Sequence, residues 1–327
     1  MNNLLVSPYT SYDFDDVHII TDRMGVVSSR NDVKFDNNRI IVAPMSAIQN
    51  SGFNKECVKH SLSLPVHRFC SVEEQRILMK EAIETKKMYD STSLLWLSVG
   101  LKDWKERFNA NKEFLDICPF EMMLDVANCY TKDCIEEIKK IKQYTSLNVS
   151  SGNVHTGLAF YDMIEQSGAN MLRAGIGNGA ACLTSDHTGV GRGQLTLVLD
   201  MHKIHFNSEG RIISDGGIRK PGDAAKAFGA GADYIMIGGM FKDAVESQAW
   251  QSGVFYGGAS SIAKGMVGND NRYIEGKALT VNKDLVASSV QNIVNSLADG
   301  VRSSISYCGY ESLEEFIGNA QFEVKHK

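Results

Sequence analysis

The sequence predicts an α/β fold, a (β/α)8 TIM barrel, and three observations support this prediction. Short apolar runs typical of buried parallel strands recur along the chain, and each is followed by a segment with helical spacing. There are eight such runs, the number of strands that closes this barrel. Together they occupy a segment near the typical size of ~250 residues. A doubly wound open sheet is the alternative, but it does not require eight strands.

The predicted elements alternate along the chain. The predicted strands are 40–44, 62–67, 94–100, 122–128, 147–153, 171–177, 211–217 and 234–239. The clearest helical segments between them are 73–87, 131–143, 157–167 and 222–230. An irregular stretch, 11–36, precedes the first strand, and a further helix is expected over 285–301. Over 249–276 the helical pattern breaks, and so long a loop inside a compact domain is more often functional than not.

Composition and charge are those of an ordinary globular chain. The 327 residues suffice for one large barrel, and 43% hydrophobic and 22% charged residues are typical of a soluble protein. A net charge of −5 gives no electrostatic footprint for nucleic acid. The seven cysteines include no Cys-x-x-Cys pair, which favours a reducing setting over a disulfide framework or a zinc site. Because neither a signal peptide nor a membrane-spanning run is recognisable, we expect a cytoplasmic protein that binds neither nucleic acid nor membrane.

One glycine-rich stretch in the second half of the chain carries the strongest chemical signal. Three glycines at alternate positions precede a lone cysteine, Cys182, and a second glycine cluster follows over 188–194. Such glycines let the backbone approach a ligand closely, and a cysteine there is a candidate nucleophile if its pKa is lowered. The plainer interpretation is a flexible loop with an incidental buried cysteine. Two further glycine pairs at predicted strand ends, Gly216-Gly217 and Gly238-Gly239, favour an active site.

The barrel gives the candidate residues a common location, because catalytic residues of such barrels lie at the carboxyl ends of the strands. The conspicuous residues at these ends are His67, Arg68, Ser98, Asp125, Asn128, the Cys182 loop, Asp215 and the two glycine pairs. Glycine pairs after the last two strands suit a phosphate, whose oxygens can accept hydrogen bonds from backbone N–H groups. In the long loop, Glu275 is an acid/base candidate, although an isolated carboxylate is more often a solvated surface charge.

Several motifs, covering nearly the whole chain, resemble the IMP dehydrogenase and GMP reductase family. They are DFDDV at 13–17, LDVAN at 124–128, GIGNGAACLT at 175–184, TGVGRGQ at 188–194, ISDGG at 213–217 and KAFGAGAD at 226–233. IEGK at 274–277 and GVRS at 300–303 look like the GMP reductase branch, and no Arg-Tyr dyad of the dehydrogenase flap is visible. We therefore expect one catalytic domain over 1–327, with an active-site flap over about 249–280 and no CBS regulatory insertion.

The resemblance implies a redox reaction at carbon 2 of a purine nucleotide. In a GMP reductase the thiolate, here Cys182, attacks that carbon and ammonia leaves. NADPH then delivers hydride to the thioimidate, and IMP is released. Thr184 and Glu275 match residues that assist proton transfer, while Arg68 stands where the reductases have a lysine and cannot donate a proton near neutral pH. Enzymes of this family are usually tetramers, so we expect a homotetramer.

The resemblance also implies ligand contacts, with Asp215 on the ribose hydroxyls and glycines on the phosphate. The implied nucleotide contacts are Gly179, Asp215, Gly216, Gly217, Gly238, Gly239, Tyr256, Gly257 and Arg272. The implied cofactor contacts are Ser29, Arg30, Asp125, Val126, Ala127, Ser303 and Ser304. The carbonyl groups of Gly177, Gly179 and Cys182 match the potassium site of the family.

The chain departs from the reductase pattern inside the expected pocket. Besides Arg68, the departures are Ser46 for aspartate, Leu101 for threonine, Ala180 for serine, Ser185 for arginine and Gly258-Ala259 for Met-Ser. Each buried polar partner left unmatched would cost roughly 1–3 kcal/mol in an unmodified GMP pocket. We therefore expect a GMP reductase-like enzyme that acts on GMP or on an altered or deoxy purine nucleotide. An NAD-dependent IMP dehydrogenase-like oxidation and a catalytically silent nucleotide-binding relative are the alternatives.

Overall fold

The computed structural model describes residues 10–205, 209–266, 275–284 and 286–325. Its eight parallel strands have the order β2-β9-β8-β7-β6-β5-β4-β3. Their bounds are β2 Ile40–Val42, β3 Leu64–Val66, β4 Leu95–Val99, β5 Glu121–Asp125, β6 Val149–Val154, β7 Met171–Ala174, β8 Arg211–Asp215 and β9 Tyr234–Ile237. A parallel bridge between Ile41 and Ser63 joins β2 to the chain just before β3. The predicted (β/α)8 barrel and all eight predicted strands are therefore confirmed.

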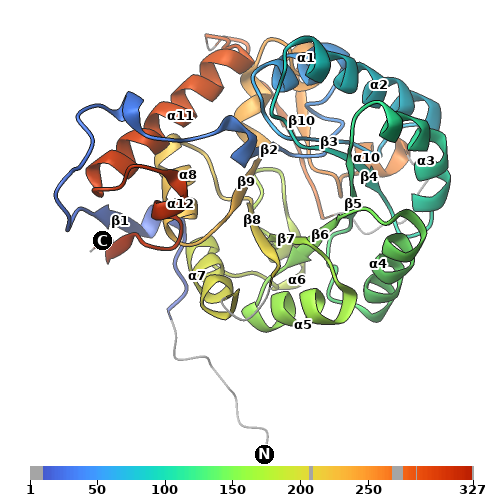
Figure 1. Ribbon diagram of the computed structural model, residues 1–327. Coiled ribbons are helices and arrows are strands. Elements are labelled where there is room, and N and C mark those ends of the chain that lie inside the picture. Colours follow the sequence, from blue (N-terminus) through green and yellow to red (C-terminus); the bar gives the residue numbers. More distant parts are fainter. Residues whose placement is uncertain (1–9, 206–208, 267–274, 285, 326–327) are drawn as a thin grey trace, which may run out of the picture.

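Helices surround the ring of strands, as Figure 1 shows. The helices that follow the barrel strands are α1 Ser51–Lys59, α2 Val72–Met88, α3 Trp104–Asn111, α4 Lys132–Thr145, α5 Gly157–Ser167, α7 Gln194–His205, α8 Pro221–Gly229 and α11 Val290–Tyr307. The shorter helices are α6 Thr184–Thr188, α9 Gln248–Ser252, α10 Ser261–Met266 and α12 Leu313–Phe316. The 3-10 turns are η1 Phe14–Asp16, η2 Arg30–Asp32, η3 Asn37–Arg39, η4 Lys112–Asp116 and η5 Gly239–Asp243. No helix of the described residues is long and apolar enough to cross a membrane.

Local sequence explains where these elements begin. Barrel strands such as β2 and β9 are apolar at every position and buried throughout, as expected for strands covered on both faces. Helices begin at capping residues that satisfy free backbone N–H groups: Thr131 accepts from the Cys134 N–H before α4, and Thr156 accepts from the Ala159 N–H before α5. The predicted helices 131–143 and 157–167 begin at or next to these caps. Pro221 opens α8, where its fixed φ suits the first turn.

Two antiparallel ribbons lie outside the barrel sheet. β1 Val17–Ile20 pairs with β12 Gln321–Val324, so the stretch predicted to be irregular contains a strand. That pairing was missed because the two short strands lie at opposite ends of the chain. In the predicted flap, β10 Val254–Tyr256 pairs with β11 Ala278–Thr280. The last long helix, α11, begins later than predicted and continues to Tyr307.

Candidate active site

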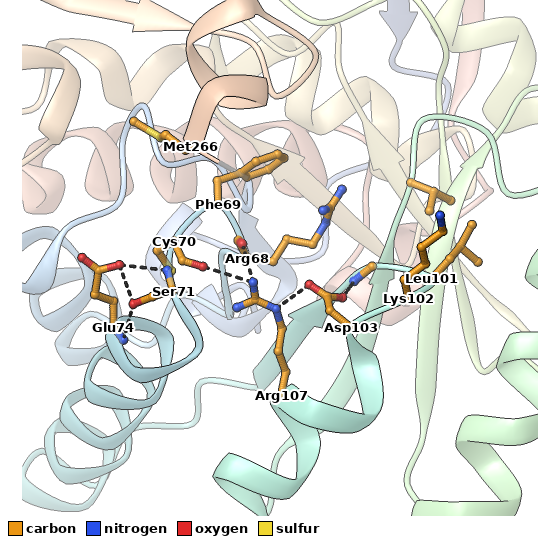
Figure 2. A pocket seen from close by; sticks show the side chains of 12 residues that line it. Arg68, Phe69, Cys70, Ser71, Glu74, Leu101, Lys102, Asp103, Arg107 and Met266 are labelled. Atoms are coloured by element: carbon orange, nitrogen blue, oxygen red, sulfur yellow. Dashed lines mark hydrogen bonds and ion pairs between the residues drawn. The ribbon is translucent and has the colours of Figure 1, made fainter. Parts of the chain in front are cut away.

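Three adjoining cavities lie at the carboxyl ends of the barrel strands. The central cavity, of about 370 Å³, is lined by Cys182 and Asp215 among others. The glycine cavity has a volume of about 180 Å³ and is also lined by these two residues. Most of its other lining residues are small and come from the loops after β7, β8 and β9 and from the flap. The outer cavity, of about 870 Å³, shares Arg68, Phe69 and Val126 with the central one (Figure 2). The central and outer cavities have sizes in the range of ligand sites, and the smaller glycine cavity adjoins the central one.

Cys182, Thr184 and Glu275 form a hydrogen-bonded chain. The half-buried Cys182 thiol donates to Thr184 Oγ1 over 3.1 Å. The Thr184 hydroxyl donates in turn to Glu275 Oε2 over 2.9 Å. A carboxylate that accepts through a hydroxyl can take up and return the proton of a thiol. Glu275 is therefore part of the cysteine site and not a solvated surface charge.

Backbone pairing holds the cysteine loop against the flap. The Leu183 N–H donates to the Glu275 carbonyl over 2.7 Å, and the Lys277 N–H donates to the Ala181 carbonyl over 3.0 Å. Between these bonds, Cys182 and Gly276 form an antiparallel bridge. A Cβ on Gly276 would lie 2.8 Å from the Ser260 N atom, so the close approach requires glycine. This pairing fixes where the Glu275 carboxylate lies relative to the thiol.

A second polar group is carried by the barrel strands themselves. Asp125, at the end of β5, accepts from Arg173 Nη2 over 2.8 Å and from Arg68 Nε over 3.3 Å. Burial alone would raise the pKa of Asp125, but the Arg173 and Arg68 guanidiniums hold it below its ordinary value. Arg68 also lies 4.8 Å from the centre of the Phe69 ring. Asp125 is therefore an ionised, fixed carboxylate at the junction of the central and outer cavities.

Asp215, at the end of β8, has a different environment. It accepts from Asn153 Nδ2 over 2.8 Å. Burial raises the pKa of Asp215, and the Arg173 charge and the Asn153 hydrogen bond only partly oppose this effect. Asp215 lines both the central and the glycine cavity. Its carboxylate is thus placed beside Cys182 with acceptor capacity left for hydroxyl donors.

The glycine cavity collects most of the residues predicted to bind the nucleotide. Gly179, Gly216, Gly238, Gly239 and Gly257 line it. Gly216 has a φ of +100°, which few other residues adopt, and a Cβ on Gly239 would lie 3.2 Å from the Ala180 Cβ. Gly217 is held by its N–H, which donates to the Asn178 carbonyl over 2.9 Å.

The residues around Tyr256 show how the chain fills places where it departs from the reductase pattern. The Ser46 and Tyr256 hydroxyls lie 3.2 Å apart and share a hydrogen bond. A Cβ on Gly258 would lie 3.3 Å from Phe69 Cζ, so the ring occupies the space that a larger residue there would need. Ala259 lines both the central and the glycine cavity. The pocket is therefore reshaped rather than simply opened at this position.

Arg107 and Leu101 shape the outer cavity. In Figure 2, Arg107 bonds to Asp103 and to the carbonyls of Arg68 and Cys70. The Asp103 contact measures 2.6 Å and the two carbonyl contacts 3.0 and 3.1 Å. The side chain of Arg107 is buried, and sequence reasoning did not identify it. Leu101 presents an apolar side chain to this cavity, where the reductase pattern has a hydroxyl.

The predicted cofactor residues fall into two separate groups. Asp125 and Val126 lie where the cavities meet, and Ala127 lines the central one. Ser29 caps η2, which packs against α11, the helix that carries Ser303 and Ser304. Arg30 there pairs with Asp299 over 3.1 Å. None of the three cavities is lined by this second group.

The remaining predicted ligands are only partly described. Arg272 lies outside the described residues. The Gly179 carbonyl accepts the Cys182 N–H over 3.0 Å, which leaves one lone pair of this predicted potassium ligand. A Cβ on Gly177 would lie 2.9 Å from Ser185 Oγ, so the serine packs against this loop. Carbonyl oxygens are hard ligands, and the residues present are compatible with an alkali cation.

Sequence reasoning missed Arg173 and Asn153. Both lie inside predicted strands, and neither was singled out as a candidate site residue. An arginine within the buried run Met171–Ala174 is a usable signal, because a buried guanidinium needs a carboxylate partner. Asn153 gives no comparable signal. Of the conspicuous residues, His67, Ser98 and Asn128 line none of the three cavities.

Comparison with known proteins agrees with this geometry. The profile of the IMP dehydrogenase / GMP reductase domain matches residues 11–326. The chain is 30% identical to a GMP reductase of Caenorhabditis elegans, over 95% of this chain and 90% of the relative. It is 30% identical to GMP reductase 2 of Bos taurus over 95% and 93%, and 31% identical to a GMP reductase of Escherichia coli O157:H7 over 94% and 93%. The chain therefore belongs to the IMP dehydrogenase / GMP reductase family.

Proposed function

We propose that this protein is an NADPH-dependent purine nucleotide reductase that converts GMP, or a close analogue, to the IMP-type product and ammonia. The observation that carries the proposal is the hydrogen-bonded chain Cys182–Thr184–Glu275, which lies where the glycine cavity meets the central cavity. Relatives named GMP reductase along nearly the whole chain support the same reaction class.

In this proposal the residues of the chain bind the nucleotide across two cavities. Backbone N–H groups of the glycine cavity take the phosphate, and Asp215 accepts hydrogen bonds from the ribose hydroxyls. This arrangement brings the base beside Cys182. Gly257 lines the glycine cavity, where the phosphate would lie, and the family resemblance adds Tyr256 and Arg272 as nucleotide contacts.

Cys182 acts as the nucleophile. Its thiolate forms the bond to carbon 2, and the amine departs as ammonia, leaving a thioimidate on the cysteine. Glu275, through Thr184, takes the thiol proton and returns it to the departing amine, so protons balance without another acid. Arg68 presents a guanidinium cation and contributes by electrostatics alone. NADPH, when bound, supplies the hydride that replaces sulfur at carbon 2.

The outer cavity and its junction fit the dinucleotide. Asp125, Val126 and Ala127 line the central cavity, and Val126 and the Arg68 cation also line the outer one. The second group of cofactor residues, Ser29, Arg30, Ser303 and Ser304, would contribute only from a neighbouring copy. Their position outside the three cavities supports our proposal of a homotetramer, and we propose further that each copy is a single catalytic domain without a regulatory insertion. Potassium bound by the Gly177, Gly179 and Cys182 carbonyls would order the cysteine loop.

The test is oxidation of NADPH by the purified protein with GMP, dGMP and other purine nucleotides, with product identification and C182A as the control. We expect cysteine-dependent formation of ammonia and the deaminated nucleotide. Turnover on another nucleotide alone would assign the Ala180, Gly258 and Ala259 changes to altered specificity. Nucleotide binding with no turnover in either redox direction would overturn the proposal and favour a silent relative.

A further inference from the structure

Arg173 is a buried cation between the two candidate ligand sites. It lies in β7, and only 5% of its side chain is exposed. Its Nη2 group donates to Asp125 Oδ1 over 2.8 Å, to the Gly152 carbonyl over 3.2 Å and to the Val126 carbonyl over 3.3 Å. It thus holds the ends of β5 and β6 and one residue of the cofactor group. Arg173 also lines the central cavity beside Asp215.

The charges alternate across the barrel end. Arg68 pairs with Asp125, Asp125 pairs with Arg173, and the Arg173 charge acts on Asp215. Asp125 has two cations, whereas Arg173 is the one cation that acts on Asp215 among the interactions of the described residues. Without Arg173, Asp125 would keep Arg68, but Asp215 would face another carboxylate with no compensating charge.

We propose that Arg173 is a positioning residue for both ligands, fixing Asp125 at the cofactor junction and supplying the charge that keeps Asp215 a carboxylate able to accept ribose hydroxyls. This inference rests on the proposed function only in naming those ligands. The geometric part rests on the Arg173–Asp125 ion pair and on the central cavity, which Arg173 and Asp215 both line.

The groups around Asp215 make its pKa depend on the charge of Arg173. Asn153 from β6 donates a neutral hydrogen bond, and Asp125 from β5 adds a repelling charge. Cys182 from the loop after β7 and Glu275 from the flap face the same glycine cavity, and neither side chain can carry a positive charge. Burial already raises the pKa of Asp215. Removing Arg173 would raise that pKa further, and a protonated carboxyl accepts hydroxyl donors less strongly.

The experiment has a readout that needs no turnover. The infrared difference spectrum between R173M and R173M/D215N reports the carbonyl band of protonated Asp215 as the pH is varied. The difference spectrum between the wild type and D215N gives the same band when Arg173 is present. We expect the Asp215 pKa to be higher in R173M than in the wild type, and that of R173K to lie close to the wild-type value. R219M, at an exposed arginine, controls for loss of a surface charge.

GMP binding then connects this titration to the ligand. At neutral pH, R173M should bind GMP about 10- to 100-fold more weakly, as expected for a weakened hydrogen bond to a charged group. Binding should recover as the pH rises and Asp215 ionises, while D215N should stay weak at every pH. An unchanged Asp215 titration, or weak R173M binding that does not recover with pH, overturns the inference. If the wild type binds no GMP, the proposed function fails, and the infrared titration still decides the role of Arg173.

Discussion

The two polar groups of the candidate site are built in different ways. Asp125, Arg173 and Asp215 lie on barrel strands, and their positions are set by the sheet register, which aligns Asp125 with Gly152 and Gly152 with Arg173. Cys182, Thr184 and Glu275 lie on a loop and a flap, and the Thr184–Glu275 bond joins residues 91 positions apart. The strand-borne group is charged and buried, whereas the loop-borne group depends on a few backbone bonds.

This difference separates stability from chemistry. A carboxylate and an arginine buried together stabilise the fold only while both are present, because each alone would be an uncompensated charge. The loop-borne residues bear little of the barrel core, so they can be changed with small effects on folding and large effects on turnover. Substitutions in the two groups should therefore have opposite signatures.

The largest effect on activity is expected for Cys182→Ala. Loss of the nucleophile should reduce turnover at least about 10⁴-fold. GMP affinity and the free energy of unfolding should change little, because the side chain is small and half-buried. Steady-state kinetics, calorimetric GMP titration and urea unfolding measure the three quantities. Residual turnover close to the wild-type rate would remove Cys182 from the mechanism.

Glu275→Gln should follow, with kcat lower by about 10²- to 10⁴-fold, the range for loss of a general acid/base. Thr184→Val should show a similar loss, since it interrupts the same hydrogen-bonded chain. The matched control is Thr188→Val, which changes a threonine of the same short helix whose hydroxyl donates to the Thr184 carbonyl instead. Equal losses in the control and in Thr184→Val would indicate that loop order, not proton transfer, is affected.

In the strand-borne group, Asp125→Asn should destabilise the fold by about 3–5 kcal/mol at neutral pH, because it leaves Arg173 buried without its partner. The Asp125 pKa is depressed in the folded state, so this contribution is present above the ordinary aspartate pKa and disappears as the pH falls through the folded value. Urea unfolding of wild type and variant should therefore converge in acid. The exposed Asp15→Asn is the control, with a small effect. A constant difference down to the lowest accessible pH would contradict this assignment.

The smallest effect is expected for Arg68→Lys, which restores the residue of the reductase pattern. The lysine keeps a positive charge near Asp125, but it lacks the forked donors of the guanidinium and its stacking on the Phe69 ring. Turnover should therefore change by less than about tenfold. A lysine can titrate, so a new basic limb should enter the pH profile of kcat. A large rise in rate without that limb would show that Arg68 limits the wild-type enzyme for another reason.

The barrel and the cysteine loop were predictable from local patterns, while the strand-borne group was not. Eight apolar runs, the glycine loop and the flap motif each have their own signature in the sequence. Arg173 and Asn153 matter because the sheet register brings them next to Asp125 and Asp215, and pairing between strands is a tertiary property. The β1–β12 ribbon was missed for the same reason, since its partners are separated by almost the whole chain.

The most direct test of the central claim is alkylation of the native protein with a thiol reagent, followed by peptide mapping with and without GMP. Cys70 is the internal control: it is also only partly buried, but burial raises its pKa to about 11. We predict that Cys182 reacts faster than Cys70 and the five buried cysteines, and that GMP protects it. Reaction of Cys182 no faster than that of Cys70, with no protection by GMP, would contradict a nucleophile at a nucleotide site.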